Sequence, residues 1–397
     1  MKNLRVVSAD DPIAFLAELR LALTAGGEAL LPRSGPAGPG GELIARVPIT
    51  TAVVIETSGS TGTPKRVQLS RSALLSSAAA SASMLGGPGQ WLLALPAHYV
   101  AGVQVLVRSI AAETTPICMP PAHFDPLVFA QYADRLTEPL RYTSLVPVQL
   151  ARLLDASARD PHVADVLRRF TAILVGGQAV SPALVSRAHA AGVNLVRTYG
   201  SSETAGGCVY NGMPIGTTRV RAVDGLLQIS GPVLADGYLG DPERTDEHFS
   251  VDAGVRWFHT GDLGTVDENG LVTVTGRADN VIISGGEKIS LDAAQAVVRR
   301  QPGFETAVVV GADHPEWGRV PVVVLAGDDP SRGAGEDRRE LLSQLGDAVA
   351  RELGRAGRPA RILVVAEIPL LASGKPDLQA LAGLATGAHT PELGGTP

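Results

Sequence analysis

A run of small and hydroxyl-bearing residues that ends in a lysine follows a short β-branched stretch near the start of the chain. The stretch is 51–55, and the run comprises Thr57, Ser58, Gly59, Ser60, Thr61, Gly62, Thr63, Pro64 and Lys65. Glycine lets a backbone approach phosphate oxygens closely, and Ser and Thr hydroxyls can donate hydrogen bonds to them. A P-loop NTPase needs Gly-Lys-Ser/Thr at the end, whereas Arg66 follows the lysine here. We therefore predict a strand leading into a phosphate loop of another kind, with a flexible surface loop as the alternative.

The composition indicates a globular protein of two or three domains. The chain has 397 residues, of which 45% are hydrophobic and 19% charged. Its net charge of −6 disfavours a nucleic-acid partner, and two cysteines disfavour both a disulfide framework and a cysteine zinc site. The first ten residues lack the apolar core of a signal peptide, and no stretch reaches ~18 uninterrupted apolar residues. We expect a cytoplasmic protein without stable membrane insertion, and leave a homodimer open.

Hydrophobic periodicity predicts an α/β region followed by a small α+β unit. A helical pattern covers 11–31, and strands expected at 91–95, 172–175, 195–199 and 226–229 alternate with helices at 72–84 and 182–191. After residue 255 come shorter expected strands, at 257–258, 271–274, 281–283, 307–310, 321–325 and 361–365. Ser181 is a candidate N-cap for the helix at 182–191 and Ser290 for a helix through Arg300, and 341–353 is amphipathic.

The loop at 57–65 resembles the phosphate-loop signature of the adenylate-forming superfamily, which includes acyl- and aryl-CoA ligases, firefly luciferase and peptide-synthetase adenylation domains. A second match covers 199–204. The resemblance implies that Tyr199 packs on adenine, Thr204 contacts phosphate and Glu203 helps to hold Mg²⁺. Mg²⁺ is commonly held by one or two carboxylates together with phosphate oxygens. Standing alone, Glu203 would be interpreted as a solvated loop carboxylate.

Three further segments match the superfamily in the same order along the chain. In Thr260-Gly261-Asp262 the resemblance implies that Asp262 accepts hydrogen bonds from both ribose hydroxyls. In 276–288 it implies that Arg277 contacts ribose or α-phosphate, that Asp279 is the interdomain hinge, and that Gly285 and Gly286 lie beside the pantetheine tunnel. In 371–377 it makes Lys375 the lysine that reaches the active site during adenylation. Without the resemblance, Arg277 would be interpreted as a surface ion-pair partner.

A smaller match, Gly176-Gly177, implies a flat backbone surface for adenine and the acyl group. The resemblance therefore implies a large N-terminal α/β domain of layered sheets and helices, 1–278, that binds ATP and the acid. A small mobile C-terminal α+β domain, 279–385, would act as a lid, and 386–397 would be a disordered tail.

The implied activity is an AMP-forming acid–thiol ligase with ATP, Mg²⁺ and coenzyme A as cofactors or co-substrates, and a small carboxylic acid as substrate. Lys375, Glu203 and Lys65 would be the catalytic residues. Reactions of this kind depend on positioning and charge stabilisation, and none of the eight histidines lies in a Ser-His-Asp context.

The acid is indicated by segment 95–109, which resembles the o-succinylbenzoate–CoA ligases of menaquinone biosynthesis. That substrate has two carboxylates, so a buried cation would hold one while the other reacts. We assign Arg108, His98 and Gly200 to the acid site, although Arg108 could instead form a structural ion pair and His98 could simply pack in the core. Alternatives are another aryl- or short-acyl-CoA ligase, an enzyme that loads a carrier-protein thiol, and a catalytically silent nucleotide-binding module.

Overall fold

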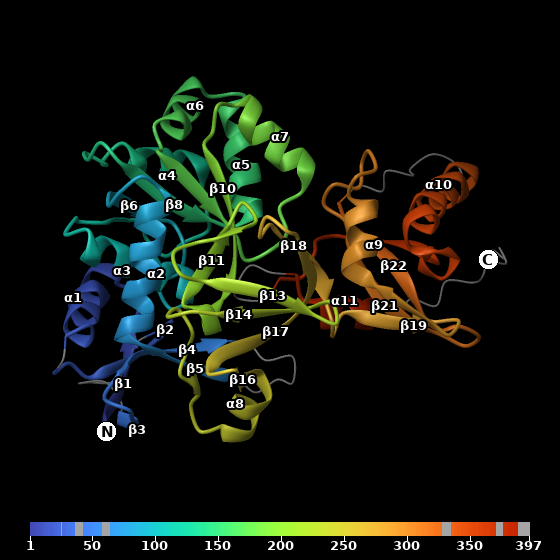
Figure 1. Cartoon of the computed structure of the whole chain (residues 1–397). Coiled ribbons are helices and arrows are strands. Elements are labelled where there is room, and N and C mark those ends of the chain that lie inside the picture. Colours follow the sequence, from blue (N-terminus) through green and yellow to red (C-terminus); the bar gives the residue numbers. More distant parts are fainter. Residues whose placement is uncertain (25, 36–42, 58–63, 328–334, 371–375, 388–397) are drawn as a thin grey trace.

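The chain forms a large N-terminal lobe and a small C-terminal lobe (Figure 1). The structure is a computed structural model, and it describes residues 1–24, 26–35, 43–57, 64–327, 335–370 and 376–387. The amino terminus lies in the large lobe and the carboxyl-terminal helix in the small one. Within those ranges, no helix combines the length and apolar character needed to cross a membrane.

The first sheet of the large lobe carries both ends of the predicted phosphate loop. Its strand order is β15-β5-β4-β2-β1-β3. The strands are β1 (Lys2–Ser8), β2 (Ala29–Arg33), β3 (Leu43–Val47), β4 (Thr51–Thr57), β5 (Lys65–Ser70) and β15 (Gly237–Tyr238). Thr57, the last residue of β4, pairs with Lys65, the first residue of β5, so the loop begins and ends at one point of the sheet.

The helix expected over 11–31 is wrong beyond residue 22. Helix α1 (Pro12–Ala22) ends there, and β2 pairs in parallel with β1 instead. Two glycines, Gly26 and Gly27, interrupt the pattern before the apolar run of β2, whose first four residues are buried. A short apolar run is equally compatible with a buried strand and a buried helix, and tertiary pairing decides between them.

The second sheet is the centre of the large lobe, with order β12-β11-β10-β9-β8-β6-β7. Its strands are β6 (Gln90–Leu93), β7 (Ile117–Cys118), β8 (Arg141–Leu145), β9 (Ala172–Val175), β10 (Leu195–Ser201), β11 (Gly206–Tyr210) and β12 (Met213–Pro214). Trp91 and Leu93 pack on one face while Leu92 packs on the other, because successive strand residues point to opposite faces.

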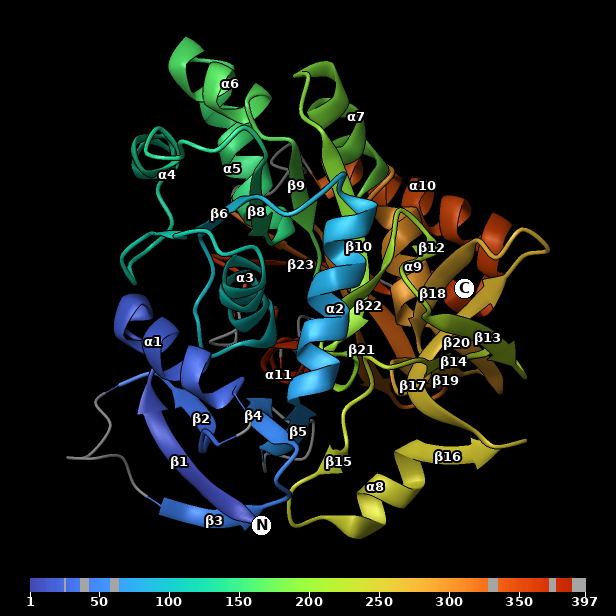
Figure 2. The ribbon, with the colours of Figure 1, turned by 60° about the vertical axis from the view of Figure 1, so that its left-hand side comes forward.

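Helices cover both faces of this sheet (Figure 2). On one face lie α4 (Pro126–Ala133), α5 (Pro147–Ser157), α6 (Pro161–Arg168) and α7 (Pro182–Ala190). On the other lie α2 (Arg71–Met84) and α3 (Val100–Ala111), and α2 also contacts β4 and β5 of the first sheet. Ser181 caps α7 as expected, accepting a hydrogen bond from the Leu184 backbone N–H. The large lobe is thus layered, as predicted.

A third sheet completes the large lobe, with order β13-β14-β17-β16 and β18 paired to β17. Its members are β13 (Arg219–Val223), β14 (Leu226–Ser230), β16 (Phe249–Asp252), β17 (Val255–Val266) and β18 (Val272–Arg277). The short elements η1 (Ser202–Thr204) and α8 (Pro242–His248) lie outside the sheets. Strand β17 carries the Thr260-Gly261-Asp262 segment.

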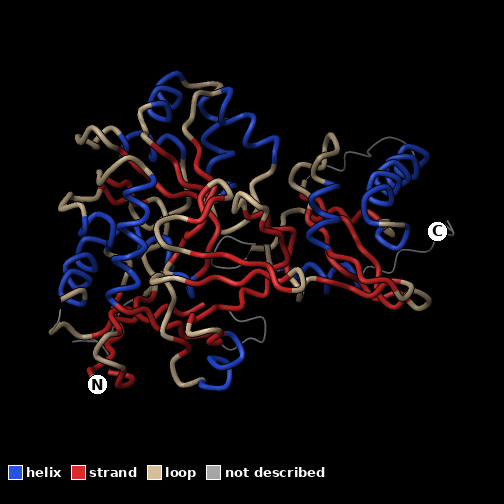
Figure 3. Tube along the Cα trace, in the orientation of Figure 1, coloured by secondary structure: helices blue, strands red, loops and turns tan. Residues whose placement is uncertain are grey.

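The small lobe is one sheet with helices on both faces (Figure 3). Its strands are β19 (Val281–Ser284), β20 (Glu287–Ser290), β21 (Val308–His314), β22 (Gly318–Ala326) and β23 (Arg361–Val365). Helices α9 (Leu291–Val298) and α10 (Gly335–Leu353) share one core with the sheet, with η2 (Arg355–Gly357) following α10, and α11 (Leu378–Gly387) packs on the opposite face. The disordered tail was predicted to begin at residue 386, but residues 386 and 387 belong to α11. Residues 388–397 lie outside the described residues.

The two lobes join in the turn between β18 and β19, where the predicted boundary at 278/279 falls. Asp292, in the first turn of α9, bridges this turn: its carboxylate accepts hydrogen bonds from the Arg277 backbone N–H and from the Asn280 side chain, both at 2.8 Å. Ser290 caps α9 as expected, although the helix ends at Val298 and not at Arg300.

Candidate functional site

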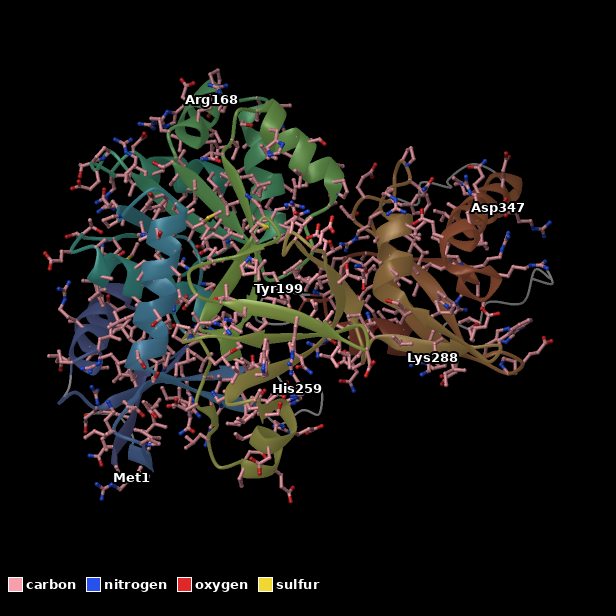
Figure 4. All side chains as sticks on the ribbon, in the orientation of Figure 1. Met1, Arg168, Tyr199, His259, Lys288 and Asp347 are labelled. Carbon is pink, nitrogen blue, oxygen red and sulfur yellow. The ribbon has the colours of Figure 1, made fainter. Side chains whose placement is uncertain are left out.

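One cavity brings together six of the predicted site residues that the structure describes, namely Lys65, Tyr199, Gly200, Glu203, Asp262 and Arg277. It lies in the large lobe at the side where β18 leads to the small lobe, and Tyr199 and His259 mark it in Figure 4. The lining residues are Lys65, Tyr199, Gly200, Ser201, Glu203, Ile229, Tyr238, His248, Phe258, His259, Thr260, Gly261, Asp262 and Arg277. They come from β5, β10, η1, β14, β15, α8, β17 and β18, which are far apart in sequence.

One end of the cavity holds a cation near the ring of Tyr238 and a carboxylate bound to its hydroxyl. Its hydroxyl donates to Glu203 Oε1 at 2.8 Å, and Lys65 Nζ lies 5.8 Å from its ring centroid. Tyr238 is 5% exposed and Glu203 9% exposed. No acidic side chain of the described residues pairs with Lys65. Strand pairing sets this geometry, because β15 runs alongside β5 with Tyr238 opposite Val67.

The other end is built from Tyr199, Asp262 and Arg277. The Tyr199 hydroxyl donates to Asp262 Oδ2 at 2.5 Å, and Arg277 Nη1 lies 3.3 Å from Asp262 Oδ1. Burial raises the pKa of Asp262, while the hydrogen bond from Tyr199 and the charge of Arg277 oppose that shift. Burial and the neighbouring Asp262 carboxylate raise the pKa of Tyr199, so the phenol stays a donor. A carboxylate has enough lone pairs to accept further donors here.

Arg277 also forms a two-pronged ion pair with Asp279, the predicted hinge residue. Nε and Nη2 lie 3.1 and 3.0 Å from the two carboxylate oxygens. The Arg277 guanidinium holds the pKa of Asp279 below its usual value. The guanidinium therefore connects Asp262 in the cavity to the junction between the lobes.

The remaining nucleotide residues predicted from the sequence lie in different surroundings. Gly200 lines the cavity, and a Cβ there would lie 2.2 Å from the Gly206 carbonyl oxygen, so only glycine fits. Thr204 is fully buried; its hydroxyl donates to the Gly206 carbonyl at 2.8 Å and accepts from the Ser201 backbone N–H at 2.9 Å, so this side chain holds the turn together and does not line the cavity. Gly176 and Gly177 follow β9, and a Cβ at Gly176 would lie 2.3 Å from Thr198 Oγ1.

Part of the predicted site falls outside the described residues. These positions are Ser58, Gly59, Ser60, Thr61, Gly62, Thr63 and Lys375. Thr57 at the end of β4 and Lys65 at the start of β5 fix where the first group begins and ends. Pro376 and Asp377, directly after Lys375, are described, and the Asp377 backbone N–H donates to the Pro369 carbonyl at 2.8 Å.

Two residues assigned to the acid, Arg108 and His98, do not line this cavity. Arg108 is 6% exposed in α3, where Nη2 donates to the Tyr210 hydroxyl at 3.2 Å and the guanidinium lies 4.8 Å from the Trp91 ring centroid. Its Nε has no hydrogen-bond partner in the described part of the chain. His98 is half-buried, its ring centroid lies 4.2 Å from that of Tyr99, and burial lowers its pKa.

The two glycines assigned to the pantetheine path form the turn between β19 and β20 in the small lobe. Both have positive φ, at 55° and 88°. A Cβ on Gly285 would lie 2.5 Å from the Trp317 ring, so the close approach of these segments requires glycine.

Sequence reasoning missed several side chains of the cavity, among them Tyr238, His248 and His259. Tyr238 lies 35 residues from Glu203, and no local spacing connects them. His259 directly precedes the Thr260-Gly261-Asp262 segment, so that adjacency was a usable signal. His259 is held by the Ser250 hydroxyl at 2.7 Å and by the Gln228 amide at 3.4 Å.

Comparison with known proteins identifies the family of this chain. The family described as AMP-binding enzyme matches residues 19–239, which is more than half of the chain, and the AMP-binding enzyme C-terminal domain matches 295–375. The chain belongs to the AMP-binding enzymes. The predicted membership of the adenylate-forming superfamily is therefore confirmed, and so is the predicted fold class.

Individual AMP-binding enzymes resemble the chain over most of its length. A protein of Mycobacterium tuberculosis strain H37Rv named as a probable 2-succinylbenzoate–CoA ligase is 39% identical over 335 residues, covering 83% of each chain. The 2-succinylbenzoate–CoA ligase of Enterococcus faecalis is 28% identical, covering 82% of this chain and 68% of its own.

Solved structures of related enzymes also superpose on most of the chain. The o-succinylbenzoate CoA synthetase of Bacillus subtilis, in complex with the acyl-adenylate intermediate OSB-AMP, superposes with a TM-score of 0.69 and 28% identity. The match covers 83% of this chain and 69% of that one. The amide bond synthetase of Marinactinospora thermotolerans superposes with a TM-score of 0.73 and 25% identity, covering 96% and 80%.

Proposed function

We propose that this AMP-binding enzyme joins 2-succinylbenzoate to coenzyme A, by way of an acyl-adenylate. The observation that carries the proposal is the convergence of Lys65, Glu203, Tyr199, Asp262 and Arg277 on one cavity, from separate elements of the large lobe. The 39% identity to a relative named for this reaction supports the choice of acid.

In the first half-reaction an oxygen of the acid carboxylate attacks the α-phosphorus of ATP, and pyrophosphate leaves. Tyr199, Asp262 and Arg277 bind the nucleoside end, since the Asp262 carboxylate can accept from ribose hydroxyls. Lys65, whose ammonium pairs with no acidic side chain of the described residues, faces the departing phosphates and compensates their charge in a partly buried site. Lys375, which lies outside the described residues, is proposed to bridge the acid carboxylate and ATP.

Glu203 is the residue proposed to hold Mg²⁺. One of its oxygens is fixed by Tyr238, and the other has no hydrogen-bond donor in the described part of the chain, so the carboxylate fits an ion held by one carboxylate and by substrate phosphates. Bound there, Mg²⁺ would neutralise phosphate charge. No cluster of three or more potential metal ligands occurs among the described His, Cys, Asp and Glu residues, so a metal cage built by the protein alone is not part of this proposal.

The acid is proposed to extend from Gly200 towards Arg108. Gly200, which lines the cavity, pairs with Gly207 of β11. Gln104 packs on Gly206 from α3, and Arg108 lies one helical turn further along, against Tyr210 at the end of the same strand.

The buried guanidinium of Arg108 suits a second carboxylate. Arg108 Nε is buried and has no hydrogen-bond partner among the described residues, so its N–H is free to donate to an anion. No carboxylate of the described residues forms an ion pair with Arg108. A buried guanidinium without an anion is costly, and a dicarboxylic acid would supply that anion. His98, two residues before the first residue of α3, would line the pocket.

In the second half-reaction the thiol of coenzyme A attacks the acyl carbonyl, and AMP leaves. Lys375 must then withdraw, which the small lobe achieves by rotating at Asp279. In the present conformation Arg277 holds Asp279 through two hydrogen bonds, so rotation has to break or rebuild that pair. Gly285 and Gly286 would lie on the pantetheine path.

The test measures pyrophosphate release with 2-succinylbenzoate, benzoate and a fatty acid, each with and without coenzyme A. Of the three acids, we expect only 2-succinylbenzoate to cause pyrophosphate release, and we expect a thioester to form when coenzyme A is added. Release with benzoate only would identify another aryl-CoA ligase. Release without thioester formation would favour a carrier-protein thiol as acceptor. No release with any acid would contradict the proposal.

A further inference from the structure

His248 is a second nitrogen base at the end of the cavity that holds Lys65 and Glu203. It is the last residue of α8, it is half-buried, and its ring lines the cavity. The ring stands edge-on to Tyr238, with centroids 5.7 Å apart and planes at 66°. Lys65 Nζ lies 5.8 Å from the same tyrosine ring. Lys65 and His248 therefore both lie close to one aromatic ring, whose hydroxyl holds Glu203.

The polar atoms of His248 are available, unlike those of the other histidine in the cavity. Neither ring nitrogen of His248 forms a hydrogen bond or ion pair with any residue the structure describes. In His259, by contrast, Nε2 lies 2.7 Å from the Ser250 hydroxyl and Nδ1 3.4 Å from the Gln228 amide. A cavity-lining imidazole without a partner can accept or donate to a bound molecule.

The charges around His248 come from three elements. Lys65 faces it from β5, Glu203 from η1, and Arg244 and Glu247 lie on α8 itself, while the neutral phenol of Tyr238 faces it from β15. Burial and the positive charge of Lys65 lower the pKa of His248, and the two glutamates oppose that shift. In the free protein near neutral pH the imidazole is therefore mostly uncharged. A polyphosphate placed beside Lys65 would reverse the local potential and favour the imidazolium.

We propose that His248 binds the polyphosphate of the nucleotide beside Lys65, and takes up a proton from the solvent when that polyphosphate enters. The proposal rests on the proposed function, since it assumes that ATP occupies this cavity with its phosphates at the Lys65 end. AMP, which lacks the β- and γ-phosphates, would leave His248 neutral. Proton uptake would add a second cation where pyrophosphate leaves, without a permanent positive charge in the free site.

The experiment measures binding by calorimetry with ATP, pyrophosphate and AMP, each with Mg²⁺ present. Titrations at pH 6, 7 and 8 in two buffers of different ionisation enthalpy give the number of protons taken up per nucleotide. The variants are His248→Gln, which keeps a polar side chain, His248→Lys, which carries a fixed charge, and His189→Gln. His189 is an exposed residue in the last turn of α7 and controls for the loss of one imidazole.

We expect His248→Gln to weaken ATP and pyrophosphate binding by about tenfold at pH 6, because a charge-assisted hydrogen bond is lost. The difference should shrink to less than about twofold at pH 8, since the wild-type imidazole is protonated below its bound-state pKa and neutral above it. Proton uptake should disappear in this variant, and AMP binding should not change. His248→Lys should retain ATP affinity at pH 8 without proton uptake, and His189→Gln should behave as wild type.

Equal proton uptake by wild type and His248→Gln would overturn the proposal, because the ionisation of ATP itself is common to both. An equal loss of AMP affinity would also overturn it, since the substitution would then act on the shape of the cavity. These titrations need neither acid nor coenzyme A. If the protein binds nucleotide but does not catalyse the ligase reaction, only the proposed function is contradicted. If it binds no nucleotide at all, both the proposed function and the role of His248 are contradicted.

Discussion

The substitution Tyr238→Phe tests whether Glu203 depends on a neighbouring hydroxyl for its position. It removes only the oxygen that donates to Glu203 Oε1 at 2.8 Å. The phenyl ring can still pack against His248 and Phe249 and lie below Lys65. No other donor of the described residues reaches this carboxylate, so the variant isolates one hydrogen bond.

The expected magnitude follows from the burial of the two side chains. A hydrogen bond to a charged group is worth about 1.5–3 kcal/mol, and part of that loss is recovered because a carboxylate facing a cavity can be hydrated. We therefore expect the nucleotide-free protein to lose about 1–2 kcal/mol of unfolding free energy. Removing the partner that orients a metal ligand typically lowers metal affinity about 10–100-fold. The Mg²⁺ concentration that gives half-maximal pyrophosphate release should rise in that range.

The assay follows pyrophosphate release against free Mg²⁺ at saturating ATP and 2-succinylbenzoate. The rate at saturating Mg²⁺ should approach that of wild type, because the ion itself then holds the carboxylate. Tyr132→Phe is the matched control, since its hydroxyl forms no hydrogen bond within the described chain. An unchanged Mg²⁺ dependence together with unchanged stability would refute the reasoning. A lower rate that Mg²⁺ cannot restore would place the hydroxyl in another role.

Three further outcomes are expected. Lys375→Ala should abolish adenylation and spare thiol transfer from a supplied acyl-adenylate, whereas Asp279→Pro should spare adenylation and abolish thiol transfer. Each half-reaction is measured separately, and an equal loss of both half-reactions in either variant would refute this division. Arg108→Met should raise the KM for 2-succinylbenzoate about 10–100-fold, with little change for a monocarboxylic acid and no loss of stability, and parallel losses for both acids would refute the assignment. Glu56→Gln should reduce the fall in melting temperature between pH 7 and pH 3. Arg33 and Arg66 lower the pKa of Glu56 below 4.5, so the ionised carboxylate stabilises the fold above that pH, and this stabilisation is lost as pH falls through the folded-state pKa. Parallel curves for the two proteins would contradict that last result.

Short-range signals in the sequence were sufficient for the segments that carry the chemistry. The glycine- and hydroxyl-rich loop, the Thr260-Gly261-Asp262 turn and the caps at Ser181 and Ser290 depend on residues within a few positions of each other. Their order along the chain led to the family that the comparisons confirm.

Local pattern did not decide between helix and strand after residue 22. Residues 29–33 are apolar and short, and only pairing with β1 makes them a strand. The same limit applies to Thr204, which the motif assigns to phosphate but which the fold buries in its own turn.

Tertiary structure alone decided which side chains share the cavity. Tyr238 reaches Glu203 because β15 pairs with β5, and His248 follows because α8 leads on from that strand. Arg108 was visible in the sequence as a lone cation, but its burial against Tyr210, with no carboxylate partner among the described residues, was not. Contacts between residues tens of positions apart are fixed by sheet pairing and packing, which leave no periodic trace in the sequence. The amino-acid order therefore determined the kind of chemistry, and the packing of the sheets determined which residues surround it.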